Sequence, residues 1–106
     1  MRSARIIRNE DIERVLIGVP KDHKHLRVYM KLKDAALIFQ EAVIANILRA
    51  YLTIKTHPTI RAQELKVHKL GETPRKQGYA LHQLLETSRN QDEIEEELRE
   101  LLEEPT

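Results

Sequence analysis

The chain contains no cysteine and no tryptophan, and its 106 residues include only one phenylalanine and three tyrosines. The absence of cysteine excludes disulfides, thiol chemistry and zinc sites with cysteine ligands, and it leads us to expect a cytoplasmic protein. The scarcity of aromatic rings leaves few surfaces on which bases or sugars can stack. Charged residues make up 33% of the chain, as in many heat-adapted proteins, so we also expect a thermophilic source.

No segment has the length and hydrophobicity of a secretory signal or of a membrane span. Residues 1–9 carry three arginines around Ile6 and Ile7 and fall short of the roughly 7–15 apolar residues of a signal h-region. A membrane-spanning helix needs about 20 predominantly apolar residues, and the sequence has no such run. We therefore expect neither export by the secretory route nor a membrane partner.

Sequence motifs for catalysis and metal binding are also missing. The chain has no glycine motif for phosphate binding, and neither Ser3 nor Ser88 lies in the glycine-flanked turn of a serine hydrolase. Residues 22–25 form the tightest group of metal-ligating residue types, but neighbouring lysines and Arg27 surround them with positive charge. The sequence therefore favours a binding protein over an enzyme, and we expect neither a cofactor nor a bound metal.

Positive and negative charges are separated along the chain. Residues 1–78 contain 16 Lys and Arg against 8 Asp and Glu, whereas residues 79–106 contain 2 against 9. The two parts carry formal charges of +8 and −7, although the whole chain carries +1. A cationic body can attract an anionic partner, and an acidic terminal segment can compete with that partner for the body.

Alternating apolar and polar residues predict strands in the first part of the chain. Residues 25–33 alternate without interruption, as in a half-buried strand, and their apolar side consists of Leu26, Val28, Met30 and Leu32. Residues 34–35 are expected to form a tight turn, and residues 36–40 the partner strand. Residues 12–19 fit either a short helix or a strand, and their compact apolar run favours the strand.

Residues 41–55 change to a helical period and are apolar around almost the whole helix, which His57 and Pro58 end. The exception is a polar stripe formed by Asn46, Arg49 and Thr53. This stripe either lines a pocket, with Asn46 and Arg49 as its residues, or forms the solvent-exposed edge of the helix, which we favour. The apolar remainder must be covered on more than one side, by the sheet and by a second helix or another copy of the chain, so we expect a homodimer.

The second part of the chain predicts another hairpin and a terminal helix. Residues 62–70 and 79–85 are the expected strands, and their connection, residues 71–78, contains Arg75 and Lys76. The hairpin therefore has a basic tip.

An acidic amphipathic helix is expected at the C-terminus. Asn90 is followed three residues later by Glu93, the spacing of a capping box, and apolar residues then recur on one side at Ile94, Leu98, Leu101 and Leu102. This helix either packs its leucines on the body, exchanges with a neighbouring subunit, or lies over the basic sheet face as an anionic competitor.

Together these elements predict an α+β fold and a single domain, residues 1–106, with a body at 1–89 and the acidic helix at 90–106. Antiparallel strands form a meander and then a second hairpin, and both pack on one apolar central helix.

The polar side of the strand at 25–33 is the best candidate for a binding site, because it carries a row of cations with one aromatic ring: His25, Arg27, Tyr29, Lys31 and Lys33. Alternate residues of a strand lie about 6.5–7 Å apart, close to the phosphate spacing of extended nucleic acid. If the two hairpins lie side by side, Arg75 and Lys76 join the row. Alternatively, the row is only the solvated face that antiparallel sheets present.

We therefore predict a small non-enzymatic binding module that associates with RNA or DNA through Arg27, Tyr29, Lys31, Lys33, Arg75 and Lys76. Its affinity should fall steeply with salt and rise when residues 90–106 are removed. The alternative is a homo-oligomeric protein–protein interaction module. A third hypothesis is a small-molecule binder or enzyme with a pocket beside Asn46 and Arg49.

Overall fold

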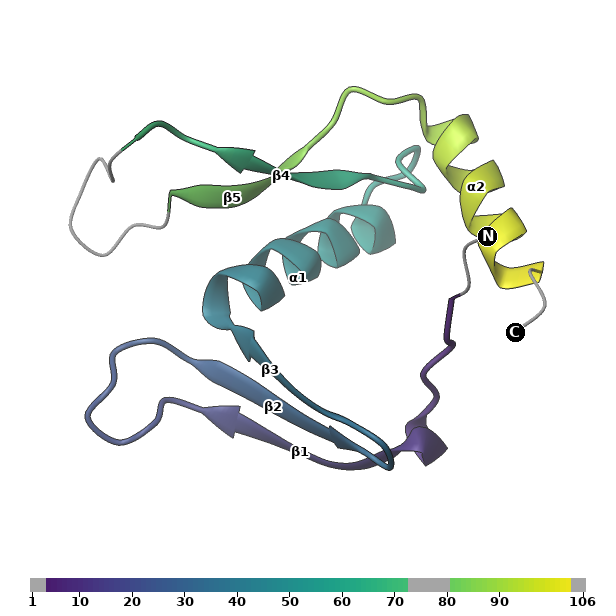
Figure 1. Ribbon diagram of the computed structural model, residues 1–106. Coiled ribbons are helices and arrows are strands. Elements are labelled where there is room, and N and C mark those ends of the chain that lie inside the picture. Colours follow the sequence, from purple (N-terminus) through teal and green to yellow (C-terminus); the bar gives the residue numbers. More distant parts are fainter. Residues whose placement is uncertain (1–3, 73–80, 104–106) are drawn as a thin grey trace. The chain divides into compact units, whose positions relative to one another are not determined.

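A computed structural model describes residues 4–72 and 81–103 of the chain. These residues form two antiparallel sheets and two α-helices, which confirms the predicted α+β fold (Figure 1). The chain divides into two compact units, Met1–Ile47 with Leu101–Thr106 and Leu48–Glu100. None of the helices in the described residues is long and apolar enough to span a membrane.

The first unit contains a three-stranded sheet in the order β1-β2-β3, with β2 in the middle. The strands are β1 (Ile12–Gly18), β2 (Arg27–Leu32) and β3 (Ala36–Gln40), preceded by the short 3-10 helix η1 (Asn9–Asp11). The strand predicted for residues 12–19 is confirmed, and β2 is shorter than the alternation suggested. Val28 and Leu32 of β2 are 6% and 3% exposed, so the predicted apolar side of this strand holds the core of the sheet.

Hydrogen-bonded turns lie in both connections of the sheet. Between β1 and β2, the His23 N–H donates to the Pro20 carbonyl at 3.0 Å, and Asp22 has a φ of 66°. Aspartate is one of the few residues that tolerate this left-handed conformation. Between β2 and β3, the Leu32 N–H donates to the Ala35 carbonyl at 2.8 Å, which confirms the predicted turn.

Helix α1 (Glu41–Thr56) follows β3 without an intervening loop and runs across the boundary between the two units. At its start, the Glu41 carboxylate accepts a hydrogen bond from the Leu26 N–H at 2.7 Å. At its end, the ring nitrogen Nδ1 of His57 accepts from the N–H groups of Thr59 and Ile60 at 3.2 and 3.3 Å. The predicted stop at His57 is therefore confirmed, and the side chain of this histidine also organises the turn that follows.

The second unit contains the antiparallel pair β4 (Leu65–Lys69) and β5 (His82–Glu86). The predicted strand began at residue 62, but Ala62 precedes the strand and is one of the buried apolar residues, at 6% exposed. The predicted connection at 71–78, with Arg75 and Lys76, lies largely outside the described residues.

Helix α2 (Gln91–Glu103) ends the described chain. The Asn90 side-chain oxygen accepts a hydrogen bond from the Asp92 N–H at 2.7 Å, so Asn90 caps the helix as the sequence predicts. Ile94 is 7% exposed and anchors the helix in its unit, whereas Leu98 and Leu102 remain 52% and 63% exposed.

Candidate functional site

The register of the three-stranded sheet brings three of the predicted site residues to one face. Directly opposite residues of an antiparallel pair point to the same side of the sheet. Tyr29 lies opposite Leu16 and Ile38, and Lys31 lies opposite Arg14 and Ala36. We call this side, with Arg14, Arg27, Tyr29 and Lys31, the Tyr29 face.

Arg14 lies next to both Tyr29 and Lys31 on the Tyr29 face. The guanidinium of Arg14 lies 5.6 Å from the centroid of the Tyr29 ring, within the range of a cation–π interaction. Lys31 lies opposite Arg14, and two like charges in that position repel. The register of the pairing shifts between Ile12 and Arg14, at Glu13. The Glu13 carboxylate lies 3.4 Å from the Lys31 ammonium. The shift therefore coincides with partial neutralisation of the lysine.

Arg27 stands at the other end of the Tyr29 face. Its guanidinium donates to the Leu26 carbonyl at 3.1 Å, and its side chain is half-buried like those of Tyr29 and Lys31. The face is therefore a partly apolar surface with cations near both ends, because Leu16 and Ile38 flank Tyr29 and are 51% and 70% exposed.

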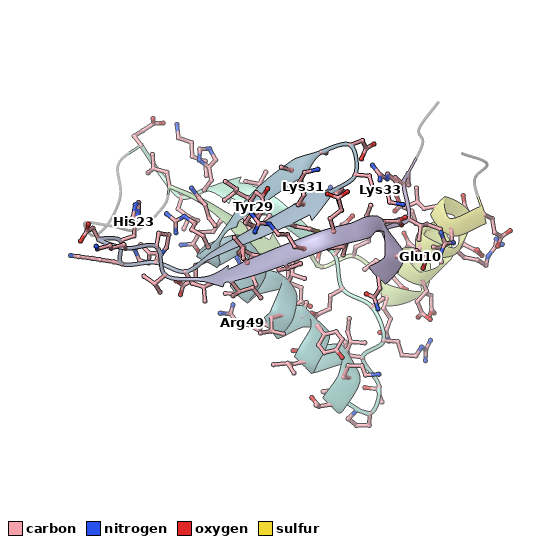
Figure 2. The ribbon with its side chains drawn as sticks, turned by 90° about the horizontal axis from the view of Figure 1, so that it is seen from below. Glu10, His23, Tyr29, Lys31, Lys33 and Arg49 are labelled. Atoms are coloured by element: carbon pink, nitrogen blue, oxygen red, sulfur yellow. The ribbon has the colours of Figure 1, made fainter. Side chains whose placement is uncertain are left out.

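Lys33 and the histidines of the preceding loop lie outside the Tyr29 face. Figure 2 shows Tyr29 and Lys31 along the sheet, with Lys33 towards one end and His23 at the other. Lys33 follows the last residue of β2 and is exposed in the turn. Arg75 and Lys76 lie outside the described residues, so their joining to the Tyr29 face stays a prediction.

The sequence pattern did not indicate Arg14 as a site residue, although its guanidinium lies over the Tyr29 ring. Only the pairing of β1 with β2 places it on this face. The one available signal was the strand pattern of residues 12–19, which does not by itself reveal the register.

Helix α1 presents a second surface, and it is apolar. Ile47, Leu48, Tyr51 and Leu52 follow the i, i+1, i+4, i+5 spacing of one helix side, and each is between 50% and 55% exposed. No described residue of α1 is buried. We call these four residues the α1 stripe. The four side chains lie together because of their spacing along α1.

The polar stripe predicted on α1 occupies a different side of the helix. Arg49 is exposed, whereas Asn46 and Thr53 are half-buried. The Thr53 hydroxyl donates to the Arg49 carbonyl at 2.9 Å, which ties this side chain to the backbone of its own helix. A pocket beside Asn46 and Arg49 stays a prediction.

Carboxylates of α2 bind arginines within the second unit. Arg61 donates to Glu95 at 2.9 and 3.2 Å, and Arg89 donates to Glu97 at 2.5 Å and to Glu64 at 3.2 Å. The hydrogen bond to Glu95 raises the pKa of Arg61, and the one to Glu97 raises the pKa of Arg89. The Arg61–Glu95 pair joins residues 34 positions apart and ties α2 to the segment before β4. Arg89 adds a second connection, because it bonds both to Glu97 of α2 and to Glu64 before β4.

In residues 4–72 and 81–103, no group of three or more histidine or carboxylate side chains is arranged to hold a metal ion.

No protein-family model, curated protein or solved structure matches the chain.

Proposed function

We propose that this chain is a homo-oligomeric protein–protein interaction module that associates through the α1 stripe. The observation that carries this proposal is the exposure of Ile47, Leu48, Tyr51 and Leu52, four adjacent apolar side chains on one side of the longest described helix. Soluble monomers rarely expose contiguous apolar patches larger than a few hundred Å². Burial of each such apolar side chain contributes about 1.5–3 kcal/mol.

The contrast between buried and exposed residues supports the proposal. Among the described residues, the buried apolar set comprises only Val28, Leu32, Ala62 and Ile94, and three of these carry large side chains. Sixteen large apolar side chains are exposed in the same part of the chain. An isolated copy therefore leaves many large apolar side chains in water, and association with another protein surface is the physical means of covering them.

The test is a mass measurement in solution by sedimentation velocity or light scattering, from below one to several hundred micromolar. We expect a dimer or larger species whose population rises with concentration. Leu48→Asp, which places a charge on the α1 stripe, should give a monomer, and Arg49→Asp, one residue away on another side of the helix, should not. A folded wild-type monomer at all concentrations would contradict the proposal.

A second candidate function is binding of a polyanion such as single-stranded RNA or DNA on the Tyr29 face. It is favoured by one observation: Arg14, Arg27 and Lys31 share a face with an aromatic ring that is flanked by exposed apolar side chains. Cations release counterions from phosphates, and an aromatic ring offers a base a stacking surface. The Arg14 guanidinium already lies over Tyr29, so a base would have to stack against the arginine or displace it.

Fluorescence anisotropy of a labelled single-stranded oligonucleotide tests this second function. We expect binding that weakens as salt increases, and loss of affinity when Arg27 and Lys31 are both replaced by glutamine. Replacing Lys66 and Lys69 of β4 removes the same charge from the other unit and is the matched control. If both double variants lose the same affinity, binding depends only on net charge and the Tyr29 face is not the binding site.

A further inference from the structure

The sequence of α1 has a heptad-like pattern that extends the α1 stripe towards both ends of the helix. Positions 41, 44, 48, 51 and 55 are separated alternately by three and four residues, the spacing at which one helix packs along another. The three inner positions are Ile44, Leu48 and Tyr51. The two outer positions are charged, with Glu41 in the first turn and Lys55 in the last.

The two charged positions are placed symmetrically about Leu48. Glu41 and Lys55 are each seven residues from it, so they lie on the same side of the helix, about 21 Å apart along its axis. A second α1 that runs antiparallel and is centred on Leu48 brings Lys55 of each copy to the level of Glu41 of the other. A parallel second copy would instead place like charges at the same level.

We infer that two copies of this chain associate through antiparallel α1 helices related by a two-fold axis beside Leu48. This inference rests on the proposed self-association and specifies its geometry. Opposite charges then flank an apolar centre at both ends, and the helix dipoles are also aligned favourably. Charge complementarity therefore favours the α1 helix of a second copy, in the antiparallel orientation, as the partner that covers the α1 stripe.

Glu41 can take part although it already has a partner within its own chain. Its carboxylate accepts the Leu26 N–H at 2.7 Å and lies 3.8 Å from the His25 ring, yet the side chain remains 52% exposed. A carboxylate has acceptor sites for several donors. The bond to Leu26 therefore holds Glu41 in place and leaves room for the ammonium of Lys55 from the other copy.

The surface is large enough to form the centre of a dimer interface. The four residues of the α1 stripe expose half or more of their side chains, on the order of 400 Å² per copy. A stable interface covers about 800 Å² on each partner. Ile44, Ala45 and the aliphatic parts of Glu41 and Lys55 lie on the same side of α1 and extend the contact area.

Because the chain has no cysteine, single cysteines can report which positions meet. We expect Leu48→Cys to form a disulfide-linked dimer under mild oxidation and Arg49→Cys to form several-fold less. Glu41→Cys and Lys55→Cys should each fail to link with themselves, because their copies are about 21 Å apart in an antiparallel pair and a disulfide requires Cα atoms within about 7 Å. A mixture of these two variants should link.

Charge reversal gives a second measurement that needs no cysteine. Lys55→Glu places a carboxylate opposite Glu41 and should raise the dimer dissociation constant about tenfold, and adding Glu41→Lys should restore most of the loss. Glu41→Lys removes the bond to Leu26 in the single and the double variant alike, so recovery in the double variant cannot come from that bond.

The outcomes separate this inference from the function on which it rests. A wild-type chain that is monomeric at all concentrations overturns both. A dimer in which Glu41→Cys links with itself, or in which neither Leu48→Cys nor the mixed variants link, keeps self-association and overturns the antiparallel α1 contact. The antiparallel contact is supported if Leu48→Cys links with itself and if Glu41→Cys and Lys55→Cys link only when the two variants are mixed.

Discussion

The Arg5 guanidinium donates two hydrogen bonds to the Asp34 carboxylate, at 2.8 and 2.9 Å. The pair joins the segment before η1 to the turn between β2 and β3, residues 29 positions apart. The hydrogen bond from Arg5 lowers the pKa of Asp34 below its ordinary value of 3.8. Because the folded state favours the ionised carboxylate, the pair contributes stability above pH 3.8 and loses it as the pH falls through the lowered pKa.

Asp34→Asn should therefore lower the melting temperature at pH 7, by about 1–3 °C for an exposed pair in a domain of this size. The difference from wild type should shrink as the pH falls below 3.8 and through the lowered pKa of Asp34, where the folded wild-type carboxylate gains a proton. Thermal unfolding followed by circular dichroism between pH 2.5 and 7 measures both effects.

Asp22→Asn is the control, because Asp22 is exposed and asparagine also tolerates its positive φ. Its melting temperature over the same pH range shows how much the loss of an exposed carboxylate changes stability without the contact to Arg5. A constant difference for Asp34→Asn across the acidic range would show that the Arg5 pair does not contribute.

Arg89 connects α2 to the segment before β4, since it donates to both Glu97 and Glu64. Arg89→Gln leaves two half-buried carboxylates without their common cation. We expect a fall of about 3–6 °C in melting temperature, and a smaller fall at 0.5 M salt, because ions screen the interaction.

Arg99→Gln removes an equally charged side chain from α2 itself. Arg99 bonds to Glu96 one turn away and is 57% exposed, so its loss should cost about 1–2 °C or less. Equal effects of the two variants would mean that the contacts of Arg89 to Glu64 and Glu97 add nothing beyond a surface charge.

Substitutions of Leu32 and Ile38 test the two sides of the three-stranded sheet separately. Leu32 is 3% exposed, and Leu32→Ala should lower the free energy of unfolding by about 2–5 kcal/mol. Ile38, on the Tyr29 face, is 70% exposed, and Ile38→Ala should cost less than about 1 kcal/mol. Urea unfolding measures both, and a large effect of Ile38→Ala would indicate that another surface covers this side of the sheet.

Local sequence signals account for most of the fold. The alternation in residues 25–33 predicted β2, residues 36–40 coincide with β3, and Asn90 caps α2 as its spacing from Glu93 suggested. Each of these signals lies within a few residues of the structure that it predicts. Strand ends were less accurate, because alternation continued into residues that do not pair.

The candidate site depended on information that is not local. Arg14 reaches Tyr29 only through the register of β1 with β2, and Arg61 reaches α2 across about thirty residues of chain. The apolar pattern of α1 showed that the helix needs cover, but the sequence could not tell which residues remain exposed. Leu48 is half exposed although its pattern is that of a core residue.

Glu13 and Lys31 give a last prediction, because they should affect polyanion binding in opposite directions. Their charged groups lie 3.4 Å apart, so Glu13 reduces the positive charge of the Tyr29 face. Glu13→Gln should strengthen binding of a labelled single-stranded oligonucleotide, and Lys31→Gln should weaken it. The salt dependence should differ between the two variants by about 0.7 in the slope of log K against log salt concentration, the contribution of one phosphate contact. Equal affinities and slopes for both variants would exclude the Tyr29 face as the polyanion site, because both act on the same lysine.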